Sequence, residues 1–352
     1  QRMICKGIYL YRTGRFSDAI DWIRQGLDGV RGSSQGRGMA VLAMAYHQNG
    51  QRDKAIETLK SAEALLASGF DDLRAGGVLD RTWHDWLATR LLHHEAVGLI
   101  RGQAGRYRLE AEVLMAEGRL DEAIDVLQNA TEVESNDAEL LLLYANALGR
   151  RQRWGETLAV IKRLIDLQPD QAVHWLRAAP LFIVTGDIEG YRKLCRDMLA
   201  RFSETNSAEE ADKIAKACLL LPDTTKDSPQ VFALAARAIV ADPTTGLGPY
   251  FEALRGLADY RQQKHAEATG RIEQNLPHVG NRASLRELNL AVLALAHHGT
   301  GQTEKAQEAL QGLAQSIDAT LAGDDIESWH DLLIAQILRQ EAESLLKGEA
   351  AD

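Results

Sequence analysis

A repeat of 34 residues in the middle of the sequence constrains the fold more than any other feature. Three windows of this length follow one another without a gap, and they begin at Ala104, Ala138 and Ala172. Within each window apolar residues recur at intervals of three, four and seven, which is the spacing of one face of an α-helix. Each window therefore indicates two antiparallel helices, and because one pair cannot bury its own apolar face, consecutive pairs must stack.

Two positions in each window carry the strongest conformational demands. The reversal between the helices needs a left-handed backbone, which glycine adopts without steric cost. A few residues later, a small side chain lets the second helix approach the first closely. The turn position holds Gly118, Gln152 and Gly186, and the close-packing position holds Ala123, Thr157 and Tyr191. The third window departs from the pattern, because a tyrosine stands where a small residue is expected.

The period, the turn glycine and the small residue resemble the tetratricopeptide repeat. Residues 118–123, with the sequence Gly-Arg-Leu-Asp-Glu-Ala, are close to the consensus of that family, and the same pattern returns after Gly14, Gly50 and Gly301. We therefore predict an all-α fold without a sheet. Its architecture is expected to be a right-handed α-α superhelix, a tetratricopeptide-like solenoid of antiparallel helix pairs.

The beginning and the end of the sequence also resemble each other. Three sets of identities recur at offsets of 246 to 251 residues: Tyr11-Arg12 as Tyr260-Arg261, Gly50-Gln51 as Gly301-Gln302, and Trp83-His84-Asp85 as Trp329-His330-Asp331. We expect one module used twice, with two repeats and a long closing helix that starts at the Trp-His-Asp motif. The predicted domains are a first module, three tandem repeats, an irregular helical linker region and a second module, at residues 1–103, 104–205, 206–249 and 250–352.

Residues that typically start or interrupt helices mark the linker region. Ser207 with two glutamates after it predicts a helix start, since serine caps helix N-termini. The segment 224–229 reads as a loop. The segment 242–249 contains two prolines and two glycines and is the strongest breaker cluster in the chain. We expect a boundary or hinge there.

Charge and composition exclude several classes of protein. The formal net charge is −10, which disfavours nucleic acid as a partner. The chain has 3 cysteines, too few and too scattered for a disulfide framework or a metal knuckle, and this usage fits the cytoplasm. No apolar stretch is long enough for a membrane span. Because the sequence begins with Gln1 and reads as helix at once, we expect it to belong to a longer protein.

A second resemblance concerns more particular motifs. The segments 43–51, 83–87, 153–158 and 216–222 are similar to the C-terminal repeat region of planctomycete-type Ser/Thr protein kinases and of WD40-repeat proteins. This resemblance implies an accessory helical region of a larger signalling protein. It implies no catalytic residue in this chain, and the sequence contains none of the kinase signatures.

Enzyme chemistry has two candidates in the sequence. Ser34 stands in a G-x-S-x-G segment, but a nucleophile elbow needs a preceding strand, and a flexible loop between repeats is the simpler interpretation. The pairs His93-His94 and His297-His298 could suggest a metal. Adjacent helical residues point about 100° apart, so we interpret them as helix-surface histidines. A hydrolase or a metal-dependent enzyme is kept as an alternative, and we predict no cofactor and no metal.

The favoured function is protein binding. In arrays of this kind the first helices of the repeats line a concave groove. Apolar side chains rimmed by arginine and asparagine suit a protein or peptide with acidic and hydrophobic groups. The predicted groove residues are Arg108, Leu142, Asn146, Arg150, Leu176, Arg177 and Ile183. A protein–protein interaction scaffold is our first hypothesis, and a structural spacer or oligomerisation array is a further alternative.

Overall fold

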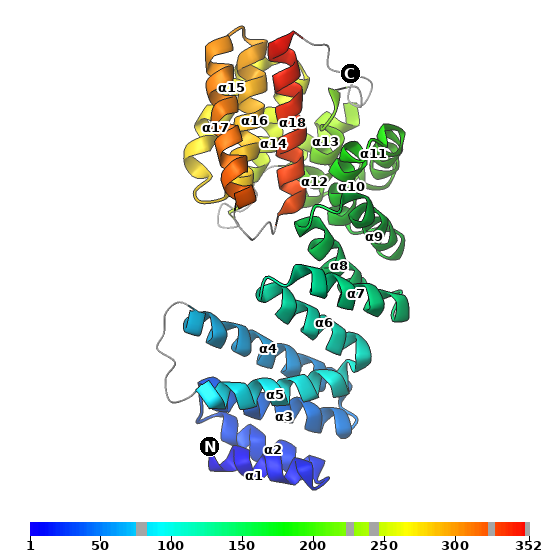
Figure 1. Ribbon diagram of the computed structural model, residues 1–352, viewed down its shortest axis with the longest axis vertical. Coiled ribbons are helices and arrows are strands. Elements are labelled where there is room, and N and C mark those ends of the chain that lie inside the picture. Colours follow the sequence, from blue (N-terminus) through cyan, green and yellow to red (C-terminus); the bar gives the residue numbers. More distant parts are fainter. Residues whose placement is uncertain (75–82, 223–228, 239–245, 323–327, 349–352) are drawn as a thin grey trace. The chain divides into compact units, whose positions relative to one another are not determined.

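In the computed structural model, helices follow one another along the described residues, which are 1–74, 83–222, 229–238, 246–322 and 328–348 (Figure 1). These residues form α-helices and one 3-10 helix, and they contain no β-strand. The predicted all-α fold is therefore confirmed. Among the same residues, no helix is both long and apolar enough to cross a membrane.

The chain divides into two compact units, which are described separately. The first contains residues 1–117 with 132–134, and the second contains 118–131 and 135–352. The helices of the first unit are α1 (Arg2–Arg12), α2 (Phe16–Leu27), α3 (Gly32–Gln48), α4 (Arg52–Arg74), α5 (Trp83–Ile100) and α6 (Gly102–Ala116).

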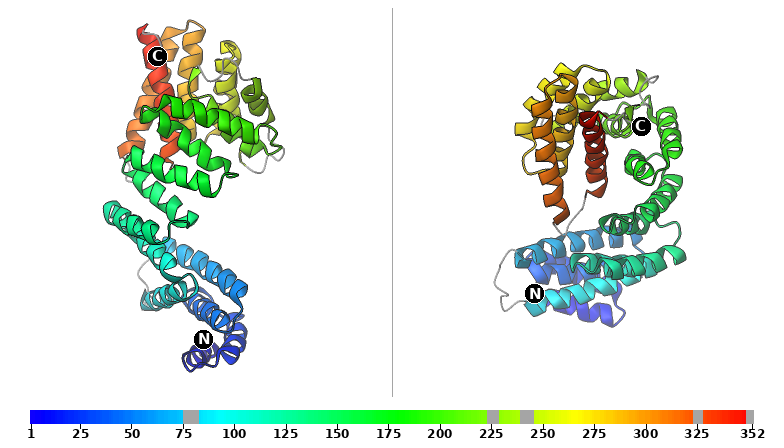
Figure 2. Two further views of the ribbon diagram at one scale, coloured as in Figure 1. Left: turned by 90° about the vertical axis from the view of Figure 1, so that its right-hand side faces the viewer. Right: turned by 45° about the horizontal axis from the view of Figure 1, so that its top comes forward.

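The second unit holds the remaining helices, starting with α7, which lies almost entirely in it. They are α7 (Leu120–Val133), α8 (Ala138–Arg150), α9 (Trp154–Leu167), α10 (Ala172–Val184), α11 (Ile188–Phe202), α12 (Ala208–Cys218), α13 (Pro229–Arg237), α14 (Gly248–Arg261), α15 (His265–Asn275), η3 (Leu276–His278), α16 (Ala283–Gly299), α17 (Thr303–Ala322) and α18 (Trp329–Lys347). Figure 2 shows the orange and red helices α16, α17 and α18 side by side in both views.

The turns between paired helices share one backbone conformation. At Gly14, for example, the next amide (Arg15) donates to the Leu10 carbonyl at 2.9 Å and the Gly14 amide donates to Tyr11 at 3.0 Å. This is a Schellman motif, in which a left-handed residue satisfies the last carbonyls of a helix. The predicted turn glycines at 50, 118, 186 and 301 also have φ between +75° and +79°. Gln152 has φ 56° at the same position. Here a residue with a side chain adopts the left-handed backbone conformation that glycine adopts without steric cost.

The close-packing positions behave as the repeat pattern predicts. Ala123, Thr157 and Tyr191 are all fully buried. Tyr191 fits because its hydroxyl leaves the helix pair and donates to the Ala217 carbonyl at 2.9 Å. The departure in the third repeat therefore has a packing reason, since the larger ring reaches α12.

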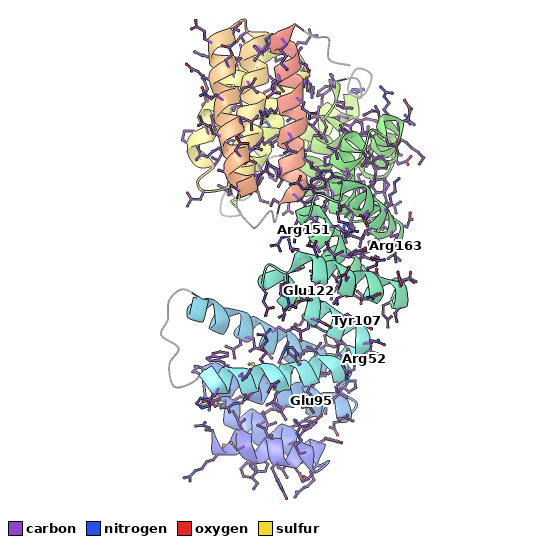
Figure 3. The ribbon with its side chains drawn as sticks, in the orientation of Figure 1. Arg52, Glu95, Tyr107, Glu122, Arg151 and Arg163 are labelled. Carbon is purple, nitrogen blue, oxygen red and sulfur yellow. The ribbon has the colours of Figure 1, made fainter. Side chains whose placement is uncertain are left out.

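Two arginines tie the second tandem repeat to the first. Arg151, just after α8, pairs with Asp121 of α7 at 2.7 Å. Arg163 of α9 donates to the Ser135 carbonyl at 3.0 Å, and Figure 3 labels both arginines. Charged side chains thus bridge the boundary between these two repeats.

Helix starts and breaks agree with the sequence only in part. Ser207 caps α12 as predicted, and its hydroxyl accepts from the Glu210 amide at 3.3 Å. The loop expected around Ser34 is wrong, because α3 begins at Gly32 and includes it. Pro180 lies inside α10, which continues to Val184. Residues 224–228 of the predicted loop and residues 242–245 of the predicted hinge lie outside the described residues.

The two predicted modules contain corresponding helices. In the first unit α1 packs on α2 and α3, while α3 contacts α4 and the closing helix α5. In the second unit α14 packs on α15 and α16, while α16 contacts α17 and the closing helix α18. Each closing helix begins at its Trp-His-Asp motif, as expected. The domain division at 103, 205 and 249 remains a prediction.

Candidate functional site

The predicted groove residues fall on two units. Arg108 lies on α6 in the first unit, where it pairs with Glu112 at 2.8 Å. The other six lie on α8 and α10 of the second unit, and we call them the α8–α10 face: Leu142, Asn146, Arg150, Leu176, Arg177 and Ile183. Leu176 is buried and the other five are half-buried. Six of the seven therefore lie on the first helices of two consecutive repeats, and both of these helices contact α18.

The tip of α18 lies on this face. The Trp329 indole is fully buried and donates from Nε1 to the Asn146 side-chain oxygen at 3.3 Å. Its ring also lies 6.3 Å from that of Trp154, which begins α9. A β-carbon on Gly149 would stand 2.7 Å from two indole atoms, so only glycine leaves room for the ring. Glycine in α8 thus creates the gap that receives Trp329.

A cluster of charges surrounds the next two residues of α18. Burial lowers the pKa of Arg177, and the nearby Asp331 carboxylate opposes that shift. Lys216 of α12 pairs with Asp212 at 3.0 Å, and both side chains are buried. Burial also lowers the pKa of His330, with Arg177 and Lys216 acting in the same direction and Asp331 against them. Arg177, a predicted groove residue, is half-buried and lies on a helix that contacts α18.

The arrangement holds a helix end through three complementary features. The Gly149 gap accepts an aromatic ring, Asn146 accepts its N–H, and Arg177 faces a carboxylate two residues further on. Sequence reasoning missed Gly149, Trp154 and the docking of Trp329. The repeated Trp-His-Asp motif was the available signal, because it marked both closing helices before their neighbours were known.

The enzyme candidates do not assemble into a reactive group. The Ser34 hydroxyl accepts a hydrogen bond from Arg37 at 3.2 Å, and Ser34 lies in a helix rather than after a strand. His93 and His297 are buried, not on the surface as predicted, and lie near Glu63 and Glu273 at 3.6 and 3.9 Å. Within the described part of the chain, no three His, Cys, Asp or Glu side chains are placed to share a metal ion.

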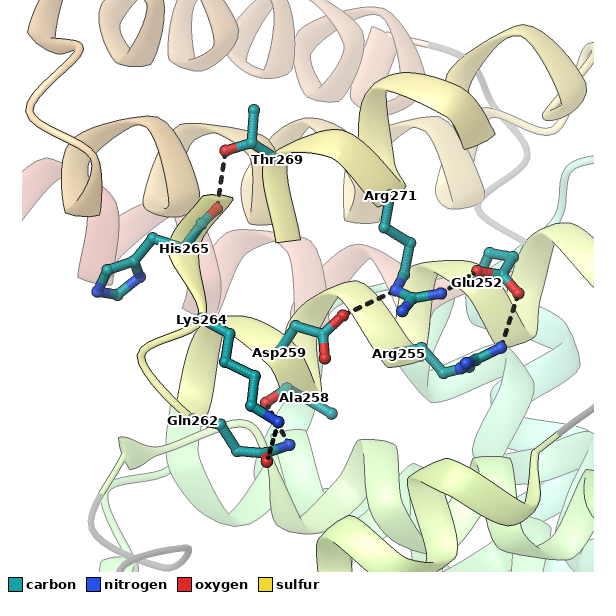
Figure 4. A network of polar contacts seen from close by, with 9 residues as sticks. All are labelled: Glu252, Arg255, Ala258, Asp259, Gln262, Lys264, His265, Thr269 and Arg271. Carbon is teal, nitrogen blue, oxygen red and sulfur yellow. Dashed lines mark hydrogen bonds and ion pairs between the residues drawn. The ribbon is translucent and has the colours of Figure 1, made fainter. Parts of the chain in front are cut away.

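An open cavity of about 500 Å³ lies along α14 and α15. Arg271 on its wall donates to Asp259 at 2.8 Å and to Glu252 at 2.7 Å, as Figure 4 shows. Asn275 donates to the Pro249 carbonyl and to Asn289. The Arg271 guanidinium and the Asn275 amide are therefore already hydrogen-bonded within the chain, and neither points to a ligand in this cavity.

The two modules also share an arginine–glutamate ion pair that the sequence did not predict. Arg12 binds Glu95 of α5 through two hydrogen bonds of 2.5 and 2.6 Å; Figure 3 labels Glu95. Arg261, the counterpart of Arg12, binds Glu341 of α18, with Nη2 to Oε2 at 2.7 Å. The first pair is exposed and the second is buried. Each closing helix is thus fastened to the first helix of its module by the same type of ion pair.

Comparison with known proteins agrees with the repeats. Models of the tetratricopeptide repeat match residues 114–179 and 37–65. These two stretches are tetratricopeptide repeats. No curated protein matches the chain in sequence.

Solved structures with similarity to the chain are distant. A human IFIT1 dimer with m7Gppp-AAAA is 17% identical, over 87% of this chain and 77% of that one, with a TM-score of 0.43. Yeast Tom70 is 12% identical, over 98% and 96% of the two chains, with a TM-score of 0.35. The TPR domain of P58(IPK) is 17% identical, over 100% and 99%, with a TM-score of 0.28. Similarity at this level does not bear on what this chain binds.

Proposed function

We propose that this chain is a protein–protein interaction scaffold and that the α8–α10 face is its binding surface. The observation that supports this proposal is the seating of α18, because a helix end with an aromatic residue and an acid occupies the face. A partner with the same chemistry, an indole or similar ring followed by a carboxylate, would fit the Gly149 gap, Asn146 and Arg177. Such a partner is acidic and hydrophobic.

In this proposal a partner competes with α18. Docked in its own chain, α18 is present at a high effective concentration, so an outside segment binds only when it replaces α18 or when α18 is loosened. We further propose that the chain is an accessory region of a larger cytoplasmic signalling protein of the kinase or WD40 type. This part of the proposal rests on the sequence resemblance.

The test uses the full chain with its face uncovered. We call the Trp329→Ala/Leu333→Asp variant the open variant, because it removes the indole and places a charge on the docking side of α18. A labelled peptide of residues 329–347 is the probe, and fluorescence anisotropy measures its binding. We expect the open variant to bind this peptide and the wild-type chain to bind it at least about tenfold more weakly, since α18 already occupies the face.

Two further variants locate the binding surface. Adding Arg177→Glu to the open variant should weaken peptide binding about tenfold or more at low salt, and added salt should reduce this difference, since exposed charges are screened over about 8–10 Å. Adding Lys193→Glu, whose side chain is 71% exposed on α11, should leave binding unchanged. Equal binding by the wild-type chain and the open variant would refute the α8–α10 face as the site.

The alternatives predict different results. If the chain is an oligomerisation array, the open variant binds no peptide and the wild-type chain sediments as an oligomer. If Ser34 is a nucleophile, hydrolysis of p-nitrophenyl acetate falls in Ser34→Ala. We propose that the chain is not an enzyme and expect the wild type and Ser34→Ala to give the same background rate.

A further inference from the structure

His330 lies where the tip of α18 meets the α8–α10 face. It follows Trp329, whose buried indole fills the Gly149 gap, and the two rings meet edge to face with their centroids 5.5 Å apart. The His330 side chain is 16% exposed, and its Nε2 atom lies 3.8 Å from an oxygen of the Asp331 carboxylate. Its Nδ1 atom is buried and has no hydrogen-bond partner among the described residues. The imidazole is therefore enclosed at the contact on which the seating of α18 depends.

The enclosed ring fits its site better when it is neutral. Neutral imidazole carries one N–H, so the nitrogen without a hydrogen can occupy the Nδ1 position, whereas imidazolium carries an N–H on both nitrogens. A buried charged donor without an acceptor loses its hydrogen bonds to water and gains none in return. Protonation of His330 therefore disfavours the docked position relative to one in which the ring reaches water.

The charged groups around the ring disfavour its protonation as well. Burial is the largest cause of the lowered pKa of His330; Asp331 opposes the shift, and Arg177 of α10 and Lys216 of α12 add to it. Lys216 pairs with Asp212 at 3.0 Å, and both side chains are buried, so this ammonium group is held in place. A proton on His330 therefore adds positive charge to a cluster that already contains two basic side chains.

The other helices that contact α18 bring different groups. They are α8, α16 and α17. The α8 helix presents the uncharged Asn146 to the tip of α18, and the half-buried Arg150 lies at its end. On α16 the buried Glu287 accepts from two hydroxyls of α17 at 3.2 and 2.7 Å, and the buried His297 lies 3.9 Å from Glu273 of α15. The buried titratable groups of α16 thus interact with α15 and α17.

We propose that His330 is a pH-sensitive switch for the α8–α10 face: its protonation loosens the tip of α18, so that mildly acidic conditions uncover the binding surface. This inference rests on the proposed function, because it concerns the regulation of that same surface. In the loosened tip the imidazole takes up a proton near its ordinary pKa of about 6.5, whereas in the docked tip it does so only at lower pH. The docked tip is therefore fully favoured above that pH and loses its advantage as pH falls through about 6.5.

Linkage also limits the size of the effect. At pH 5.5 an imidazole with an ordinary pKa is about ten times more often protonated than neutral, so proton uptake can raise the loosened population by at most about tenfold. A peptide that binds only the loosened form gains affinity by the same factor, because its apparent affinity follows the competent fraction.

The test uses the full-length chain and a probe without an imidazole of its own. The probe is a labelled peptide of residues 329–347 that carries His330→Gln. Fluorescence anisotropy measures its affinity at pH 7.5 and pH 5.5 for the wild type, His330→Gln and the open variant. Each affinity is divided by that of the open variant at the same pH, which removes any effect of pH on the uncovered face itself.

We expect the relative affinity of the wild type to rise severalfold, and at most about tenfold, between pH 7.5 and pH 5.5. His330→Gln should change by less than about twofold, because it has no proton to take up at this position. The matched control is His278→Gln, which removes an exposed histidine and should respond as the wild type does. A wild type that does not respond, or an equal rise in His330→Gln, overturns the inference.

Hydrogen exchange gives a second measurement that needs no probe. Exchange rates of the α18 amides are divided by those of an unfolded peptide of the same sequence at each pH, and α17 is the internal reference. Protection of α18 should fall at pH 5.5 in the wild type and stay constant in His330→Gln. Unchanged protection of α18 in the wild type overturns the inference.

The two proposals fail separately. If the peptide does not bind the open variant at either pH, the proposed function fails, and the exchange of α18 then decides whether His330 controls its docking. If the open variant binds the peptide but neither the wild-type affinity nor the protection of α18 responds to pH, only the present inference fails.

Discussion

At the scale of single residues, the turns between paired helices require a left-handed backbone conformation. Five of them use glycine in the left-handed region, whereas Gln152 and Gln263 have φ of 56° and 61°. A side chain there costs roughly 1–2 kcal/mol, and glycine costs about 0.4–1 kcal/mol through the entropy of the unfolded chain. The difference favours glycine.

We therefore expect Gln152→Gly to stabilise the second unit by about 0.5–1 kcal/mol. The midpoint of urea unfolding measures the change, with hydrogen exchange of α8 and α9 as a local readout. The control is Gln307→Gly, at an exposed position inside α17, which should destabilise by roughly 0.5–1 kcal/mol because glycine weakens helix interiors. A loss of stability in Gln152→Gly would contradict the assigned turn strain.

A second residue-scale prediction concerns Gly149. Its β-carbon would stand 2.7 Å from the Trp329 ring, so Gly149→Ala should displace the tip of α18 and cost about 1–3 kcal/mol. Gly155→Ala in α9 meets nothing within 4 Å and should stabilise by about 0.5–1 kcal/mol. Thermal unfolding and the Trp emission maximum report both. Similar melting temperatures for the two variants would mean that the indole does not occupy the gap.

At the scale of elements, the seating of α18 brings a titratable group into a charged cluster. Burial lowers the pKa of His330 below its ordinary value of about 6.5. As pH falls through that value, the unfolded chain takes up a proton before the folded chain does. The free energy of unfolding therefore decreases toward acid pH.

His330→Gln removes this proton uptake. We expect its free energy of unfolding to fall less than that of the wild type between pH 7 and pH 5, with a difference in slope of no more than about 1.4 kcal/mol per pH unit. Urea unfolding at several pH values measures it. His278→Gln, on the exposed side of η3, is the control and should keep the wild-type slope. Parallel pH profiles for the wild type and His330→Gln would show that His330 is not held neutral by the fold.

At the scale of the whole molecule, the same type of ion pair is exposed to solvent in the first module and buried in the second. The side chains of Arg12 and Glu95 are 50% and 39% exposed, whereas those of Arg261 and Glu341 are 2% and 10% exposed. Arg261 also donates to the carbonyls of Leu219 and Leu220, at 2.9 Å each. The second ion pair therefore joins the closing helix to the segment after α12 as well.

Loss of the arginine should have unequal effects in the two modules. Arg12→Leu should cost less than about 1 kcal/mol, since exposed pairs contribute little. Arg261→Leu leaves Glu341 buried without its partner and should cost about 3–5 kcal/mol. Hydrogen exchange followed separately in α5 and α18 gives both values. Comparable losses in the two helices would contradict the difference in burial.

The local pattern of the sequence was sufficient for the helices, the turns and the pairing of neighbours. Gly118, Ala123 and Ser207 act through their own backbone or through residues a few positions away, so their roles follow from spacing alone. The Trp-His-Asp motif likewise located the starts of α5 and α18. These features depend on interactions within one or two turns, which a period of 34 residues records directly.

What covers each surface was decided only by the tertiary structure. Trp329 and Asn146 are 183 residues apart, and no local period links them. The same Trp-His-Asp helix start is followed by a buried stripe in α18 and by the exposed Leu87 and Leu91 in α5. Spacing fixes which side of a helix is apolar, whereas burial depends on which distant helix reaches that side. That is why Arg177, predicted to face a partner, lies on a helix that the chain's own closing helix already contacts.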